Sequence, residues 1–135
     1  MLELTDPRTH DWSQVTVDHV HLRVADLARS RSFYGTVLEP LDIPFLLDLP
    51  HLVGFGNLAL SADGPPTTGA HVAFVAPTTE AVDAFHAAGL VAGATDNGAP
   101  GPRPHAPYAA YLLDPDGTNV EAVCRVGQWS AGEAS

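Results

Sequence analysis

Two histidines and one glutamate stand out because of where each falls along the chain. His19 and His71 are both followed by valine and both open a stretch of alternating polar and apolar residues, and Glu121 lies in a third such stretch. Alternation of this kind predicts β-strands, whose successive side chains point to opposite faces. Two imidazoles and one carboxylate from three strands would form a facial triad, which binds a divalent transition metal and leaves positions open for substrate, water or O₂.

The same alternation indicates which face these side chains share. His19, His71 and Glu121 each lie opposite an apolar set that would pack on a helix layer. These sets are Val20, Leu22 and Val24, then Val72, Phe74 and Ala76, and finally Val120, Ala122 and Cys124. The three polar side chains can therefore meet on one concave surface. A lone strand histidine is more often half-buried with ordinary hydrogen bonds than bound to a metal, but the repetition in two copies weakens this interpretation.

An internal repeat accounts for the recurrence of the histidines. Residues 69–90 align with residues 17–38 at an offset of 52, which matches His71 to His19. Each copy predicts a strand followed by a helix, the first helix capped by Asp26 and the second by Thr78 or Thr79. Gly89 is expected at the end of the second helix. The copies also end alike, because NLALS at 57–61 resembles NVEAV at 119–123 and places Ala59 where the second copy has Glu121.

The remaining segments are shorter or irregular. Residues 43–62 predict short strands broken at Pro50 and at Gly54 or Gly56, and DPDG at 114–117 predicts a hairpin turn. Residues 98–107 (GAPGPRPHAP) hold four prolines and two glycines, which predicts an irregular loop. Residues 1–15 lack periodicity and are expected to form an extension.

Composition narrows the classes of function. The chain has 135 residues, of which 45% are apolar and 16% charged, which suits one folded domain. Its net charge of −10 disfavours nucleic acid and anionic membranes as partners. No apolar run reaches the ~18 residues of a membrane-spanning helix. The single cysteine, Cys124, excludes an internal disulfide, and the first residues do not resemble a secretion signal, so we expect a cytoplasmic protein.

Several other side chains are candidates for the chemistry around a metal. His21 shares a strand face with His19 and could act as an acid–base group, although a place in the cavity wall is favoured. Arg103 and His105 lie in the proline-rich segment, where they could contact an anionic group of a substrate or move a proton. Tyr108 and Tyr111 fall on opposite faces of one strand, so at most one of them faces the cleft; Tyr108 is a weak candidate for catalysis and Tyr111 for substrate contact.

Three segments between residues 17 and 125 resemble the vicinal oxygen chelate superfamily, which includes glyoxalase I, the bleomycin-resistance proteins and the extradiol dioxygenases. They are DHVHLRVADLARSRSFYGTVL, AHVAFVAPTTEAVDAFHAAGL and LLDPDGTNVEAV. The resemblance implies an α+β fold of two βαβββ modules whose curved mixed sheets surround a cleft. It divides the chain into an extension (1–15), one domain (16–127, with modules at about 16–62 and 69–125) and a tail (128–135). By position, the metal ligands would be His19, His71 and Glu121.

The resemblance also implies a range of activities. A divalent Fe, Mn, Ni or Zn ion at these ligands would serve a dioxygenase-, lyase- or isomerase-type enzyme acting on a small molecule. A four-ligand glyoxalase site is disfavoured because Ala59 replaces a further glutamate, and a fosfomycin-type enzyme is disfavoured because the chain has no lysine. The alternatives are a metal-free protein that sequesters a small molecule, and a member that keeps its ligands without turnover. Unpaired sheet edges predict a homodimer, with the site in one chain or across two.

Overall fold

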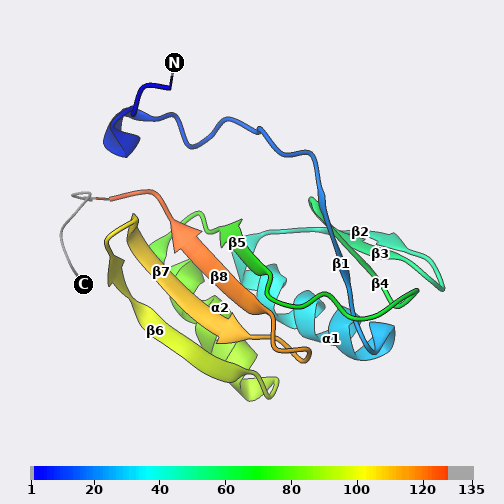
Figure 1. Ribbon diagram of the computed structural model, residues 1–135. Coiled ribbons are helices and arrows are strands. Elements are labelled where there is room, and N and C mark those ends of the chain that lie inside the picture. The colour runs from blue at the N-terminus through cyan, green and yellow to red at the C-terminus, as the bar shows by residue number, and fades with distance from the viewer. Residues whose placement is uncertain (1, 128–135) are drawn as a thin grey trace.

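The computed structural model describes residues 2–127 and contains two four-stranded mixed sheets and two α-helices (Figure 1). The predicted tail at 128–135 lies outside these residues. In chain order the elements are η1 (Pro7–Thr9), β1 (Val20–Arg23), α1 (Leu27–Leu38), η2 (Glu39–Leu41), β2 (Phe45–Asp48), β3 (Val53–Phe55), β4 (Leu58–Ser61), β5 (His71–Val75), α2 (Thr79–Val91), β6 (Thr95–Arg103), β7 (Ala106–Leu113) and β8 (Asn119–Cys124).

The two sheets repeat one topology, which confirms the predicted α+β fold of two βαβββ modules. Their strand orders are β1-β4-β3-β2 and β5-β8-β7-β6, and in each the first strand pairs in parallel with the last. His21 lies beside Ala59 in the first sheet, and Ala73 lies beside Glu121 in the second. Because those pairs are equivalent under the sequence repeat, the two copies share their register as well as their order of elements. Within residues 2–127 the two sheets do not close into one barrel.

Both helices begin where the capping residues predict. The Asp26 side chain accepts a hydrogen bond from the Arg29 amide at 3.1 Å, and the Thr78 hydroxyl accepts one from the Ala81 amide at 3.0 Å. The predicted end of the second helix at Gly89 is wrong, because α2 continues to Val91 and Gly93 takes the left-handed conformation. Gly89 is instead buried against β7, where an added Cβ would lie 2.2 Å from Leu112 Cδ1.

The prediction of a loop over residues 98–107 is also wrong. β6 runs to Arg103 and β7 starts at Ala106, so only residues 104–105 form the turn. β6 tolerates its prolines because it is an edge strand that pairs with β7 alone, and the ladder shifts register at three points along it. Residues that the sequence assigns to an irregular loop therefore lie on a hairpin with a defined geometry.

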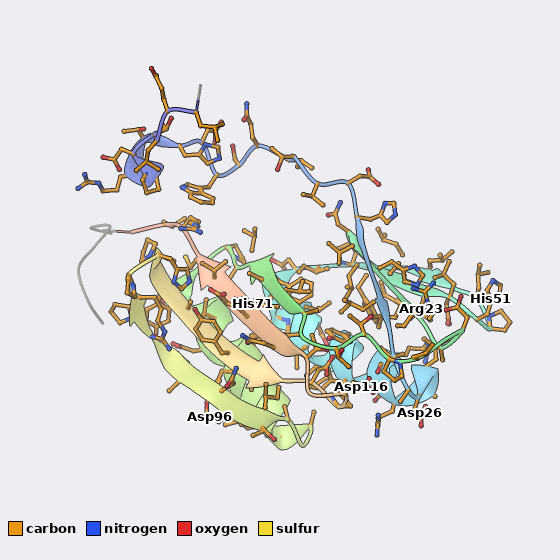
Figure 2. The ribbon with its side chains drawn as sticks, viewed as in Figure 1. Arg23, Asp26, His51, His71, Asp96 and Asp116 are labelled. Atoms are coloured by element: carbon orange, nitrogen blue, oxygen red, sulfur yellow. The ribbon has the colours of Figure 1, made fainter. Side chains whose placement is uncertain are left out.

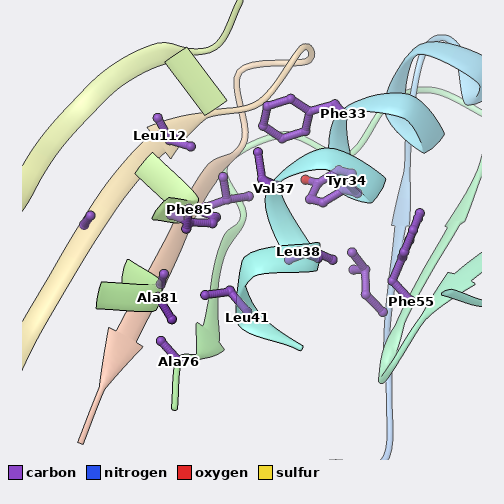
Figure 3. Packing of buried hydrophobic residues seen from close by; sticks show 14 of the residues in the cluster. Phe33, Tyr34, Val37, Leu38, Leu41, Phe55, Ala76, Ala81, Phe85 and Leu112 are labelled. Atoms are coloured by element: carbon purple, nitrogen blue, oxygen red, sulfur yellow. The ribbon is translucent and has the colours of Figure 1, made fainter. Parts of the chain in front are cut away.

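A shared hydrophobic core joins the two modules through their helices, as Figure 3 shows for Val37 and Leu38 of α1 and Phe85 of α2. The Tyr34 hydroxyl donates a hydrogen bond of 2.5 Å to the buried Asp114 carboxylate, which ties α1 to the turn between β7 and β8. Burial raises the pKa of Tyr34. Cys124 is buried on the helix side of β8, as predicted. None of the helices within residues 2–127 is long and apolar enough to cross a membrane.

Candidate functional site

Glu121 is the centre of a cluster on the open face of the second sheet. Its side chain is only 3% exposed, although the face itself is open. His71 Nε2 lies 2.9 Å from Glu121 Oε1, and His105 Nε2 lies 2.9 Å from Glu121 Oε2. Each imidazole is about half exposed. The carboxylate is thus held between two histidines that remain accessible to a small molecule.

The pairing of three strands brings this cluster together. β5 and β8 are parallel neighbours in which Ala73 pairs with Glu121, so His71 lies on the same face two residues earlier. Tyr111 of β7 is the direct cross-strand partner of Glu121, and His105 occupies the turn that leads into β7. The Tyr111 hydroxyl is 3.1 Å from His105 Nε2. Two imidazoles and a phenol therefore surround one carboxylate.

The surroundings of Tyr111 keep its hydroxyl protonated. Burial raises the pKa of Tyr111, and the neighbouring Glu121 charge raises it further, while Arg103 opposes both effects. The Arg103 guanidinium lies 5.4 Å from the centre of the Tyr111 ring. At neutral pH Tyr111 is therefore a hydrogen-bond donor and not a base. Arg103 contributes a positive charge at the edge of the cluster.

The structure brings two of the three predicted metal ligands together and leaves the third apart. His19 precedes β1 on the first sheet, with its side chain 65% exposed and its Nδ1 2.7 Å from Asp18 Oδ2. It makes no contact with the Glu121 cluster in this chain. Figure 2 shows His71 on the second sheet, apart from Arg23 on the first. Across residues 2–127, no three His, Cys, Asp or Glu side chains are grouped so that they could hold a metal ion.

His21 and Tyr108 also lie outside the cluster. His21 Nε2 is 2.7 Å from the Ser61 hydroxyl, which donates to Asp63 at 2.6 Å, so a separate polar group occupies the open face of the first sheet. The alternation that placed His21 also places Ser61 on this face, but no motif singles out Ser61 or Asp63. Tyr108 points to the helix layer and donates to Asp83 of α2 at 2.7 Å. Tyr111, on the opposite face, is the tyrosine at the cluster.

His71 and Glu121 have the separation expected of two neighbouring ligands of one ion. Two neighbouring donor atoms at ~2.1 Å from a metal lie about 3.0 Å apart in an octahedral site and about 3.4 Å apart in a tetrahedral one. The 2.9 Å between His71 Nε2 and Glu121 Oε1 is a hydrogen-bond distance, and it is close to the octahedral separation. His105 is directed at the other carboxylate oxygen, so it can orient Glu121. A complete metal site would need a further ligand from outside this cluster.

Solved structures of known proteins resemble this chain over most of its length. A glyoxalase/bleomycin resistance protein from Albidiferax ferrireducens T118 is 34% identical, with a TM-score of 0.71, and the match covers 80% of this chain and 97% of that one. A glyoxalase-related enzyme from Fulvimarina pelagi is 21% identical, with a TM-score of 0.63 and coverage of 89% and 99%. A lactoylglutathione lyase from Agrobacterium tumefaciens is 23% identical, with a TM-score of 0.60 and coverage of 82% and 94%.

The first of these likenesses assigns the family, and the other two, at lower identity, show the fold alone. The chain belongs to the glyoxalase/bleomycin resistance/dioxygenase family of the vicinal oxygen chelate superfamily. This membership confirms the family resemblance of the three sequence segments. No protein-family model matches the sequence, and no curated protein has significant similarity to it.

Proposed function

We propose that this chain is a metal-dependent enzyme of the vicinal oxygen chelate type, acting on a small molecule with two adjacent oxygen atoms. A divalent Fe, Mn, Ni or Zn ion would be held by His71 and Glu121 of one protomer and by His19 of a second copy. The observation that carries this proposal is the buried Glu121 carboxylate, placed on an open sheet face with His71 at a ligand-to-ligand distance.

The surroundings of His19 support a role as the third ligand. A metal-binding histidine commonly donates its other ring N–H to a carboxylate, which fixes the ring and leaves the opposite nitrogen for the ion. His19 has this arrangement, because its Nδ1 faces Asp18 at 2.7 Å and its Nε2 is left for another partner. The repeat makes His19 the counterpart of His71. With 65% of its side chain exposed, His19 is accessible to a neighbouring protomer.

Exposed apolar side chains support a homodimer. Leu46 on β2 is 66% exposed and Val75 on β5 is 65% exposed, and both lie on strands at the edges of open sheets. Such edges are commonly covered by another chain. A two-fold dimer would give each Glu121 cluster one His19 from the opposite protomer, and it would cover these side chains at the same time.

The residues around Glu121 suggest how protons would be handled. A bound divalent ion would supply Lewis-acid stabilisation of a developing oxyanion, or O₂ activation if it were iron. Tyr111, whose pKa is raised, would donate a hydrogen bond to a substrate oxygen. The His105 Nε2–H faces Glu121 Oε2 and lies 3.1 Å from the Tyr111 hydroxyl, and it would give up its proton and take it back. Arg103 would attract an anionic group of the substrate.

Metal content is the direct test. We expect near-stoichiometric metal by mass spectrometry in the parent purified without a tag or chelator, and at least ~100-fold weaker retention in His71→Ala, Glu121→Gln and His19→Ala. His51→Ala is the matched control, because His51 lies in the β2–β3 turn of the first module (Figure 2). Retention of metal in both His71→Ala and Glu121→Gln would refute the ligand set.

Mixed dimers test whether the site is shared between chains. A homodimer of His19→Ala or of His71→Ala would not retain metal. If His19 acts across the interface, a heterodimer of the two has one site with all its ligands and one with neither histidine. We therefore expect the mixture to recover metal in up to half of the sites of the heterodimers. No recovery in a verified heterodimer would assign His19 to its own chain or to no site.

A metal-free binding protein is the second candidate, supported by two observations. The net charge of −10 suits a cationic ligand, and both oxygens of Glu121 already have imidazole partners. Under this alternative the parent would stay empty after addition of Fe²⁺, Mn²⁺, Ni²⁺ or Zn²⁺, with no gain in thermal stability. A cationic aromatic compound would bind equally well to the parent and to Glu121→Gln.

A further inference from the structure

The N-terminal segment is folded locally before it reaches the first sheet. Asp6 caps the 3₁₀ turn η1 by accepting from the Arg8 amide at 2.9 Å, and Pro7 occupies the first helical position. The Trp12 indole N–H donates to the Pro7 carbonyl at 3.0 Å, and the centres of the Trp12 and His10 rings lie 4.8 Å apart in an edge-to-face arrangement. These contacts form a small unit, residues 6–12, which we call the N-terminal strap.

The strap lies near the C-terminal end of β8 in the second sheet, although the chain continues from it into β1 of the first sheet (Figure 1). The contact is made by Arg125, which follows β8. The Arg125 guanidinium lies 3.7 Å from the centre of the Trp12 ring, and Pro107 and Gly127 line the same small pocket. Burial lowers the pKa of Arg125, and such partial removal of water strengthens a cation–π contact.

Arg125 connects the strap to the Glu121 cluster. Its guanidinium donates a hydrogen bond of 2.5 Å to the backbone carbonyl of His105. The ring of that same residue contacts Glu121 Oε2 and the Tyr111 hydroxyl. His105 lies in the two-residue turn between β6 and β7, which the pairing of Arg103 with Ala106 closes. Arg125 therefore supports the turn from the same sheet face that carries Glu121.

We propose that the strap positions His105, with Trp12 holding the Arg125 guanidinium and Arg125 holding the His105 backbone beside Glu121. Trp12 and Arg125 are positioning residues, because Trp12 contacts the Arg125 guanidinium and Arg125 acts on His105 through its backbone carbonyl. The role of His105 in proton transfer rests on the proposed function, whereas the effect of the strap on His105 does not.

Nuclear magnetic resonance of the metal-free, full-length protein tests this proposal. The ring Cε1–Hε1 signals of His105 and His71 would be compared between the parent, Trp12→Ala and Trp12→Phe. We expect Trp12→Ala to shift and broaden the His105 signal, to weaken its cross-peak with Tyr111 and to leave His71 unchanged. Trp12→Phe should restore the parent signal, because an aromatic face over Arg125 is retained. Val15→Ala is the matched control, since Val15 is 81% exposed.

Hydrogen exchange gives a second measurement through a second variant. In Trp12→Ala and in Arg125→Gln, the amides of residues 105–106 should exchange about three- to tenfold faster than in the parent. The proposal is overturned if His105 is unchanged in Trp12→Ala, or if His71 changes as much as His105, which would indicate general loosening. Because no metal is present in either experiment, failure of the metal-centre proposal would leave these results unaffected.

Discussion

At the position where β8 of the second module carries Glu121, β4 of the first module carries Ala59. Around Glu121 the second module gathers His71, His105 and Tyr111, whereas the first module has a smaller polar group in which His21 contacts Ser61. The sheets share their strand order and register. A repeated scaffold can therefore keep its core while only one copy keeps a carboxylate suited to metal binding, because the open face contributes little to the packing that stabilises the fold.

The strongest test of the comparison concerns the cores, which we expect to be equivalent. Phe33 and Phe85 correspond under the repeat, and they are 4% and 0% exposed. Replacing either by alanine should lower the free energy of unfolding by about 3–5 kcal/mol, because each leaves a cavity in the shared core. Chemical denaturation measures both values. A cost confined to one variant would mean that the modules do not contribute equally to one core.

The two helices differ in how closely they approach their sheets. In Gly89→Ala the new Cβ would meet Leu112 at 2.2 Å, and Leu112 is fully buried. We expect a loss of about 1–3 kcal/mol from overpacking. In α1, Gly35→Ala would place Cβ no nearer than 3.8 Å to Phe55, so the better helix propensity of alanine should raise stability by up to about 1 kcal/mol. Thermal unfolding should show a lower melting temperature for Gly89→Ala and a higher one for Gly35→Ala. Equal losses in both variants would mean that the two helices lie equally close to their sheets.

The bond between Tyr34 and Asp114 links the modules and should depend on pH. Tyr34→Phe removes a buried hydrogen bond and should cost about 1–3 kcal/mol at neutral pH. Because the folded state raises the pKa of Tyr34, its contribution is complete below the ordinary tyrosine pKa of 10.0 and is lost as the pH rises above that value. Denaturation midpoints at increasing alkaline pH should fall more steeply for the parent than for Tyr34→Phe. Tyr108→Phe, which removes the bond to Asp83 near the surface, should have a much smaller effect at neutral pH.

Giving the first module a carboxylate would sharpen the comparison at the open faces. Ala59→Glu places a glutamate at the counterpart of Glu121, on the sheet that also carries His19. If that sheet faces the metal centre of a second copy, the added ligand should raise the affinity for Zn²⁺ by about tenfold, or ~1.4 kcal/mol. Titration calorimetry of the variant and the parent measures this change. Equal affinities would indicate that the first module does not contribute to the centre.

The sequence predicted the repeated module, the strand faces and the helix caps because these depend on local patterns. A period of two places His71 and Glu121 on one face once β5 and β8 pair in parallel. Asp26 and Thr78 cap their helices whatever the rest of the chain does, because each side chain bonds an amide only three residues away.

Only the tertiary structure decided which other side chains join Glu121. His105 reaches Glu121 because a proline-rich segment becomes the edge strand of a sheet, which depends on what lies beside it and not on its own composition. His19 stays apart from His71, although the repeat makes them equivalent, because the two sheets do not close on each other within one chain. Trp12 contacts Arg125 across more than a hundred residues. Such contacts depend on how the modules pack, which the local pattern of a single chain does not determine.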